Sequence, residues 1–371
     1  MLLNNTLNFM LPIAQFQMND LIDFYKGKSV FITGHTGFKG SWLTQILLDA
    51  GAEIHGYSLT PNNDQKHFDM LGLRNRVQNT FGDIRDSDLL STALEESQSE
   101  IVIHLAAQAL VRKSYEDPTE TYETNVMGSL NLLQSVRDVK SIKSLVYITS
   151  DKCYENQEWS WGYREIDALG GVDPYSSSKA CAEILFSSFQ RSFFKDLNLS
   201  AASARAGNVI GGGDWSQDRI IPDCIRAAET NSELRLRNPN ATRPWQHVLE
   251  PLSGYLSLAQ KLYEFPGKYE SSWNFGPSTQ DVRTVEQVAQ TILKAMGAGV
   301  VKFDTERTSP HEANLLQLNC EKSRQEIGWT PRWNVDTTIA KTAEWYKLVA
   351  SGTDALEITR RQIQDYFGGH K

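Results

Sequence analysis

Cysteine is scarce in this sequence. Cys153, Cys181, Cys224 and Cys320 are the four in a chain of 371 residues. No two of them have the spacing of a CxxC pair, so the sequence indicates neither a zinc ribbon nor a dithiol redox motif, and we expect no metal. Scattered cysteines in a chain of this length are typical of reduced thiols, which predicts a cytoplasmic protein.

Long apolar runs and basic clusters are missing as well. No apolar stretch approaches the roughly 20 residues that cross a bilayer, and the stretch from Met1 to Phe24 has no Lys or Arg for a secretory signal. No run is rich in Lys or Arg and the formal net charge is -8, so we expect neither a membrane nor a nucleic-acid partner. Mild acidity still permits an anionic ligand, because a few Arg side chains can gather in a cleft.

Strand-like and helix-like segments alternate along the first half of the chain. Short apolar runs at 29–33, 53–57, 101–106 and 145–149 are strand candidates. A helical pattern covers 42–50, and another helix begins at Asp117-Pro118, with Asp as N-cap. This alternation predicts an α/β fold, a doubly wound parallel Rossmann sheet with helices on both faces.

The alternation ends near residue 207, where Gly and Pro become frequent and loops are expected to carry substrate contacts. We therefore predict a Rossmann domain and a smaller C-terminal α/β substrate-binding domain. The predicted boundaries are an N-terminal extension at 1–25, the Rossmann domain at 26–207 with 247–276 returning to it, and the substrate-binding domain at 208–246 and 277–371.

A glycine-rich turn, residues 34–40 (GHTGFKG), joins the first strand to the first helix. Glycine allows a tight turn and lets the backbone approach a pyrophosphate at a helix N-terminus, where free N–H groups favour anions. A glycine triplet alone is weak, but its place between a first strand and a first helix favours dinucleotide binding over a turn without a ligand.

Tyr175 and Lys179 are four residues apart at the start of a predicted helix, so their side chains lie about 40° apart on one face. A nearby ammonium favours the phenolate and lowers the tyrosine pKa, which would make the pair a general base. A tyrosine and a lysine with this spacing also occur by chance as an exposed pair. The glycine turn upstream favours the functional interpretation.

Asp151 and Lys152 follow the strand at 145–149. Ligands of doubly wound sheets bind at the carboxyl ends of strands, so both side chains are candidates for acid and base chemistry. Solvated charges in a strand-end turn are an equally good account of the residue types alone.

Several segments together resemble a known family. They are Thr33–Trp42, Thr149–Asn156, Tyr175–Lys179, Arg205–Trp215 and Arg243–Leu252. They resemble the CDP-glucose 4,6-dehydratases, nucleotide-sugar dehydratases of the extended short-chain dehydrogenase/reductase family, over nearly everything from Lys26 to Trp333. The Asp-Lys sequence at 151–152 is the discriminating feature, because dTDP-glucose 4,6-dehydratases carry Asp-Glu there.

The resemblance implies a dehydration of CDP-D-glucose to CDP-4-dehydro-6-deoxy-D-glucose. Tyr175, assisted by Lys179 and Ser150, would remove the O4 proton while NAD oxidises C4. Water would leave across C5 and C6 with Asp151 as the acid, and hydride would return to C6. The resemblance also implies deoxysugar formation for a surface polysaccharide such as a lipopolysaccharide O-antigen.

Lys152 departs from the pattern of the related dehydratases, in which a glutamate is the presumed C5 base. A lysine serves as a base if its pKa is lowered. As a cation it would instead stabilise the enolate. Both roles stay open at this point.

Further site residues follow from the same resemblance. Asn208, Arg219 and Arg243 are expected to hold the substrate diphosphate, and the helices near 118–139 and 174–195 to pair in a homodimer or a homotetramer. NAD rather than NADP is expected from the family, since the end of the second strand, 56–59, has no acid. The expected cofactor-binding residues are Gly34, Thr36, Gly37, Phe38, Gly40, Asp83, Ile84, Leu105, Ala106, Ala107, Thr149, Tyr175 and Lys179.

Two alternatives share the same motifs. A nucleotide-sugar 4-epimerase has the fold, the glycine turn and the Tyr/Lys pair, but it needs no acid to expel a hydroxyl, which disfavours it given Asp151. A non-catalytic dinucleotide-binding regulator would not need both Tyr175 and Lys179. Fold alone does not prove chemistry, so product analysis separates the three.

Overall fold

The computed structural model of the chain describes residues 18–62, 66–278, 281–303 and 315–368. Within these ranges none of the helices combines the length and the apolar character that a bilayer crossing requires. The predicted extension at 1–25 lies largely outside the described residues. Its described part, helix α1 (Met18–Phe24), ends next to the buried Tyr25, whose hydroxyl donates to the Leu256 carbonyl over 2.7 Å.

A seven-stranded sheet forms the centre of the molecule, in the order β11-β6-β5-β4-β1-β2-β3. Every neighbouring pair is parallel, which confirms the predicted doubly wound α/β fold. The strands are β1 (Ser29–Thr33), β2 (Glu53–Ser58), β3 (Gln78–Phe81), β4 (Ile101–His104), β5 (Ser144–Ile148), β6 (Ser200–Arg205) and β11 (Ser272–Asn274).

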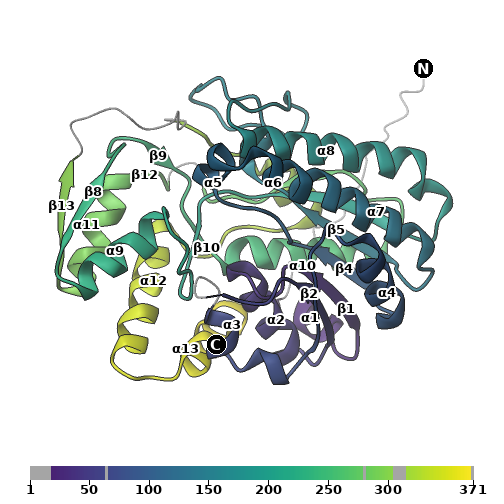
Figure 1. Cartoon of the computed structure of the whole chain (residues 1–371), viewed down its shortest axis with the longest axis horizontal. Coiled ribbons are helices and arrows are strands. Elements are labelled where there is room, and N and C mark those ends of the chain that lie inside the picture. Colours follow the sequence, from purple (N-terminus) through teal and green to yellow (C-terminus); the bar gives the residue numbers. More distant parts are fainter. Residues whose placement is uncertain (1–17, 63–65, 279–280, 304–314, 369–371) are drawn as a thin grey trace, which may run out of the picture.

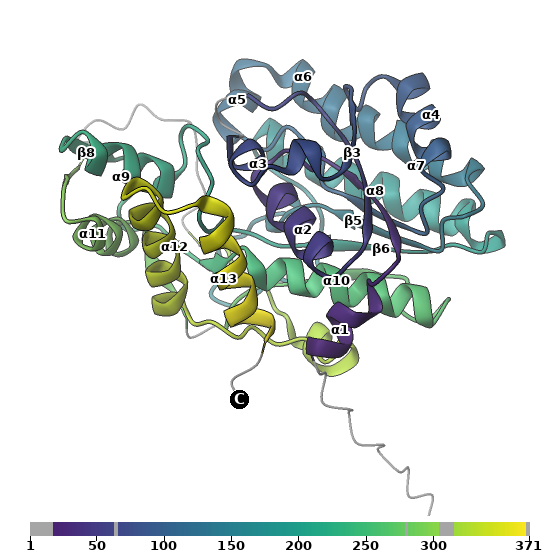
Figure 2. The same ribbon diagram turned by 90° about the horizontal axis from the view of Figure 1, so that it is seen from below.

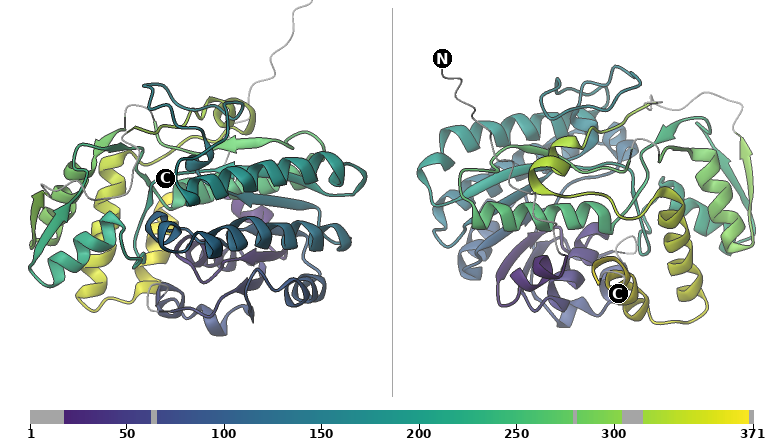
Figure 3. Two further views of the ribbon diagram at one scale, coloured as in Figure 1. Left: turned by 45° about the horizontal axis from the view of Figure 1, so that its top comes forward. Right: turned by 180° about the vertical axis from the view of Figure 1, so that it is seen from behind.

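Both faces of the sheet are buried, because successive side chains of a strand point to opposite sides. Val30 and Ile32 of β1 belong to the core with residues of α1, α2 (Phe38–Asp49) and α10 (Leu249–Glu264). Figure 2 shows these three helices from below. Phe31, between them, belongs to the core under the helices α4 (Ser87–Ser97), α7 (Gly128–Asp138) and α8 (Pro174–Ser192). The left panel of Figure 3 shows α7 and α8 side by side over that face.

The helix predicted at Asp117-Pro118 begins as expected, and the Asp117 side chain accepts from the Glu120 N–H. It is not one regular helix, however. A π-helical turn, Glu123–Met127, separates α6 (Pro118–Tyr122) from α7. Such turns are frequent at functional sites, and here the turn buries Asn125, which donates to Ser178 of α8 over 2.9 Å.

The second half of the chain adds short strands and four helices beside the sheet (Figure 1). Two-stranded pairs join β8 to β13, β9 to β12 and β7 to β10. The strands are β7 (Val209–Ile210), β8 (Glu233–Leu236), β9 (Thr242–Arg243), β10 (Gln246–His247), β12 (Arg283–Thr284) and β13 (Val300–Phe303). The helices are α9 (Ile220–Glu229), α11 (Val285–Met296), α12 (Val335–Ala350) and α13 (Ala355–Phe367).

The C-terminal helix α13 returns to the first half of the chain. It packs on α2 and on the short α3 (Lys66–Met70), and Arg360 pairs with Asp49 of α2 at 2.7 Å. In Figure 1 the yellow α13 accordingly lies beside the purple α2. The segment 247–276 supplies α10 and the edge strand β11 to the Rossmann sheet. The domain boundaries themselves stay a prediction.

Candidate active site

A cavity of about 910 Å³ opens at the carboxyl ends of β1, β4 and β5. The glycine turn, the turn after β5, the start of α8 and the loop that follows β6 all contribute to its lining. The structure brings nearly every predicted site residue to this one cavity. The five predicted catalytic residues that line it are Ser150, Asp151, Lys152, Tyr175 and Lys179.

The glycine turn is built as the sequence predicts. Gly34 has φ +74°, and a Cβ there would lie 2.7 Å from the Ala106 backbone nitrogen. A Cβ on Gly40 would lie 2.1 Å from the Gly34 carbonyl oxygen, so neither position tolerates a side chain. Helix α2 begins after Gly37 with no side-chain cap on its first N–H groups. Uncapped N–H groups at a helix start suit a diphosphate, so these residues fit a dinucleotide.

Thr36 is the exception among the predicted cofactor-binding residues, since it does not line the cavity. Its side chain is fully buried, and its hydroxyl lies 2.6 Å from that of Ser58 at the end of β2. Thr36 therefore holds the turn against the second strand. Ser58 stands there in place of the acid that often binds the adenosine ribose.

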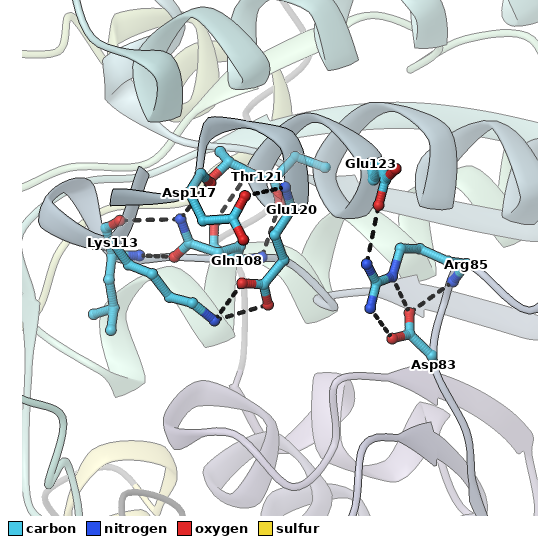
Figure 4. A network of polar contacts seen from close by, with 10 residues as sticks. Asp83, Arg85, Gln108, Lys113, Asp117, Glu120, Thr121 and Glu123 are labelled. Atoms are coloured by element: carbon cyan, nitrogen blue, oxygen red, sulfur yellow. Dashed lines mark hydrogen bonds and ion pairs between the residues drawn. The ribbon is translucent and has the colours of Figure 1, made fainter. Parts of the chain in front are cut away.

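Ion pairs line the rim where Asp83 was expected to contact the adenine (Figure 4). Asp83 lines the cavity, and Arg85 binds its carboxylate at 2.7 Å and reaches Glu123 at 3.1 Å. The hydrogen bonds from Arg85 lower the pKa of Asp83. Farther along this rim, Lys113 of α5 (Val111–Glu116) pairs with Glu120 of α6 at 2.7 Å. Arg85 is a rim residue that the sequence did not single out.

Tyr175 and Lys179 lie near the start of α8, which begins at Pro174 with Asp173 as its cap. Both side chains line the cavity and both are more than nine-tenths buried. Burial raises the pKa of Tyr175 to about 12. A hydrogen bond with Ser150 and the charge of Arg219 act to lower it, and the charge of Asp151 raises it further. The lowering of this pKa by Lys179 stays a prediction, and the largest effect on the phenol is its removal from water.

Burial also governs Lys179, and it lowers the pKa of that ammonium to about 8. The negative charge of Glu183 opposes this shift. Burial thus acts against the charged form of both members of the pair, although an ammonium with a pKa of about 8 still carries its proton at neutral pH. Stabilising the phenolate therefore depends on cationic and hydrogen-bonding neighbours of the phenol.

Asp151 is 1% exposed and sits in a short helical turn after β5. The Ser150 hydroxyl donates to its carboxylate over 2.9 Å, and the Asn208 amide donates over 3.3 Å. A Cβ on Gly207 would come within 1.8 Å of the same carboxylate, so glycine is required there. Asn208 was expected at the diphosphate, and its amide instead faces Asp151 while the residue lines the cavity.

Lys152 lines the cavity beside Asp151 and is partly exposed. Among the described residues its ammonium forms no ion pair. The side chain is therefore available to a bound molecule.

Arginines lie on the side of the cavity where the diphosphate was expected. Arg219 pairs with Asp214 at 3.0 Å, and Arg243 of β9 is buried at the cavity wall. Arg235 of β8 and Arg237, which directly follows that strand, line it too, although sequence reasoning did not single them out. Charged and apolar residues alternate in β8, a pattern that is also typical of a strand far from any site. The sequence therefore gave no reason to place these arginines at a cavity. Planar guanidinium groups suit phosphate, which takes two hydrogen bonds from one of them.

Lys39 is another lining residue that the sequence analysis passed over, although it lies inside the glycine turn. Burial, together with the charges of Arg219 and Lys179, lowers its pKa to about 8. Trp245 also lines the cavity. Trp215 instead packs edge-on against Tyr346 and under the Lys66 ammonium, away from the lining.

Comparison with known proteins places the chain among nucleotide-sugar enzymes. The family model for GDP-mannose 4,6 dehydratase matches residues 31–342. A CDP-glucose 4,6-dehydratase of Salmonella typhimurium is 48% identical, and the match covers 93% of this chain and 97% of that protein.

Solved structures share the fold at lower identity. The dTDP-glucose 4,6-dehydratase DesIV of Streptomyces venezuelae, with NAD and TYD bound, has a TM-score of 0.75 at 22% identity, covering 88% of this chain and 99% of that one. The epimerase Mth375 of Methanothermobacter thermautotrophicus has a TM-score of 0.76 at 21% identity, covering 95% and 99%. Because dehydratases and epimerases share this fold, the fold does not separate the two activities.

The glycine turn leads to a binding prediction. We expect Gly34→Ala to weaken NAD binding at least about tenfold, about 1.4 kcal/mol, because its Cβ displaces the Ala106 backbone. Gly72→Ala is the matched control, since Gly72 has φ +63° and no atom within 4 Å of a Cβ. The control should lose up to about 1 kcal/mol of stability and bind NAD normally. Calorimetric titration measures both, and equal affinity of the two variants would contradict the prediction.

Proposed function

The chain belongs to the GDP-mannose 4,6 dehydratase family, and on that premise we propose that it converts CDP-D-glucose to CDP-4-dehydro-6-deoxy-D-glucose and water, with NAD as a regenerated cofactor. The substrate assignment draws on the 48% identity, over nearly the whole of both chains, to a CDP-glucose 4,6-dehydratase. The observation that carries the chemistry is the convergence of Tyr175, Asp151 and Lys152 on the cavity that the glycine turn borders.

Bound NAD would accept a hydride and give it back, so the net change is loss of water. The chain's own groups handle the protons. Tyr175 takes the proton of the sugar O4, with Ser150 bonded to the phenol and Lys179 one turn along the same helix. Burial raises the pKa of Tyr175, so the phenolate gains from every nearby donor and cation. Arg219 acts in that direction, which gives it a role beside the diphosphate role expected from the sequence.

Asp151 is proposed to protonate the departing O6 hydroxyl. Its carboxylate is fixed by Ser150 and Asn208, so one orientation is held toward the substrate. Lys152 is the proposed partner at C5. Its side chain lines the cavity, and its ammonium forms no ion pair among the described residues. It can therefore stabilise the enolate as a cation or, equally well, act as the base.

An anionic nucleotide is supported by the arginines. Four arginines line the cavity: Arg219, Arg235, Arg237 and Arg243. Their planar guanidinium groups fit a diphosphate, although the net charge of the chain is -8. A 4-epimerase remains the second candidate, because an epimerase shares the fold with a TM-score of 0.76. The buried Asp151 favours dehydration, since an epimerase has no hydroxyl to protonate and expel.

Location and pathway belong to the same proposal. The four cysteines are free thiols, which suits a reducing compartment such as the cytoplasm. A 4-keto-6-deoxy sugar on a nucleotide carrier is activated for further reduction or amination and for transfer. This supports a place in deoxysugar formation for a surface polysaccharide such as the O-antigen.

A homodimer or homotetramer is proposed to form through the helices near 118–139 and 174–195. Large apolar side chains are exposed there: Tyr122 is 36% exposed, Met127 50% and Ile184 58%. Contiguous exposed apolar surface on helices commonly marks an interface. We expect light scattering to give twice or four times the monomer mass of 41.8 kDa. A double variant with Met127→Asp and Ile184→Asp should shift it toward the monomer, and a monomeric parent protein would contradict the proposal.

Tyr175→Phe tests the function together with the base. The parent protein incubated with CDP-glucose and NAD should yield a 4-keto product lighter than the substrate by one water, measured by mass spectrometry. The variant lacks only the phenol oxygen and should lose turnover by about 10²-fold or more while still binding NAD. A product of unchanged mass would favour the epimerase. No product with CDP-, dTDP-, GDP- or UDP-hexoses would favour a regulator.

Lys152→Ala separates elimination from the first oxidation. We expect reduced nicotinamide to accumulate in the variant on addition of CDP-glucose, because C4 oxidation does not need Lys152 and the C5 step does. Stopped-flow absorbance of the reduced ring measures it. Asp354→Asn, which alters the cap of helix α13 away from the cavity, serves as the control and should show no accumulation. A Lys152→Ala variant that also shows none would contradict the assignment.

A further inference from the structure

Glu183 is a buried carboxylate that the proposed reaction does not use. It lies one helical turn beyond Lys179 on α8 and its side chain is 2% exposed. It accepts hydrogen bonds from the Thr149 hydroxyl and, over 2.8 Å, from the Ser203 hydroxyl. Burial would raise the pKa of Glu183, but Arg205 and these hydrogen bonds outweigh it and lower the pKa, so the group is an anion.

Arg205, at the end of β6, is the partner of Glu183. Its guanidinium donates to the carboxylate over 2.7 Å, and the arginine side chain is 3% exposed. The other arm of the guanidinium donates to the Tyr154 hydroxyl over 2.8 Å. Tyr154 directly follows the turn Asp151–Cys153 and donates in turn to Asn274 of β11 over 2.8 Å. One buried ion pair thus connects the catalytic helix to the turn that carries Asp151 and Lys152.

The charge of Glu183 also reaches Lys179. Burial lowers the pKa of Lys179 to about 8, and Glu183 is the main group that raises it again. Cys153 faces Lys179 from the turn after β5, but burial raises the pKa of its thiol, so it adds no charge there. Lys39 of α2 and His104 of β4 face Lys179 from the other side, where Lys39 adds a like charge and His104 is kept neutral by burial.

We propose that the Glu183–Arg205 pair is a positioning device of the reaction: it fixes helix α8 relative to the turn with Asp151 and Lys152, and its carboxylate sustains the positive charge of Lys179. The inference rests on the proposed function, in which Lys179 assists Tyr175 as a cation. Glu183 and Arg205 do not line the cavity, so they act through other residues and not on the substrate.

The test is the pH profile of kcat/KM in Glu183→Gln. Glutamine keeps the size and still accepts from Thr149 and Ser203, but it lacks the charge. Lys179 should then lose its proton at lower pH, so the alkaline limb of the profile should move down by about one pH unit. Glu183→Asp retains the charge and should return the alkaline limb of the profile to its position in the parent protein. Ser203→Ala removes one neutral hydrogen bond and should leave the limb where it is.

A purely structural pair would lower activity equally at every pH, so an unshifted alkaline limb in folded Glu183→Gln overturns the proposal. If the unpaired arginine prevents folding, Glu183→Gln with Arg205→Gln leaves no lone buried charge and should show a downward shift. A second readout needs no turnover: the pH dependence of Lys179 acylation by a small reagent, mapped by mass spectrometry, should shift in parallel. Inactivity of the parent protein with CDP-glucose would reject the proposed function, whereas an unshifted acylation profile rejects this inference alone.

Discussion

Parallel pairing of the seven strands is the constraint on which the rest of this structure depends. Because all strands run the same way, their carboxyl ends meet at one edge of the sheet. The glycine turn after β1 and the turn with Asp151 after β5 therefore lie next to each other, although more than a hundred residues separate them. Helix α8 crosses the same edge with Tyr175 near its start. A cavity with cofactor-binding and acid-base groups follows from this topology.

Burial is the second physical theme of the site. It raises the pKa of Tyr175, lowers that of Lys179 and lowers that of Lys39, so it acts against the charged form of each group. Charged neighbours then decide which groups carry charge when it is needed. The buried Glu183 acts on Lys179 in this way, and Arg219 acts on Tyr175. Electrostatic interactions are strong in a site from which water is excluded. Each buried charge there also requires a partner, because it has lost its contact with water.

The sequence predicted four strands of the sheet and missed the others. β1, β4 and β5 were recognised because their residues are mostly apolar, and β2 was recognised although its sequence, EIHGYS, is mixed. β6 escaped because its sequence, SAASAR, consists of small and polar residues that are buried only by the helices around them. The same strand ends in Arg205, so its partner Glu183 could not be inferred from local pattern. Arg235 and Arg237 were missed for a similar reason. The alternation of charged and apolar residues around β8 is the same whether or not a cavity lies beside the strand.

The sequence by itself determined the fold class, the glycine turn and the local setting of the candidate acid-base residues, because each depends on local chemistry: Gly34 at positive φ, a capped helix start at Asp173, and an acid next to a strand end. Tertiary structure alone decided the states of these groups. Burial is the largest influence on the pKa of Tyr175, Thr36 faces β2 and not the cavity, and Asn208 donates to Asp151. Solvent exclusion and long-range charge pairing arise only once distant segments are packed together, so no local pattern encodes them.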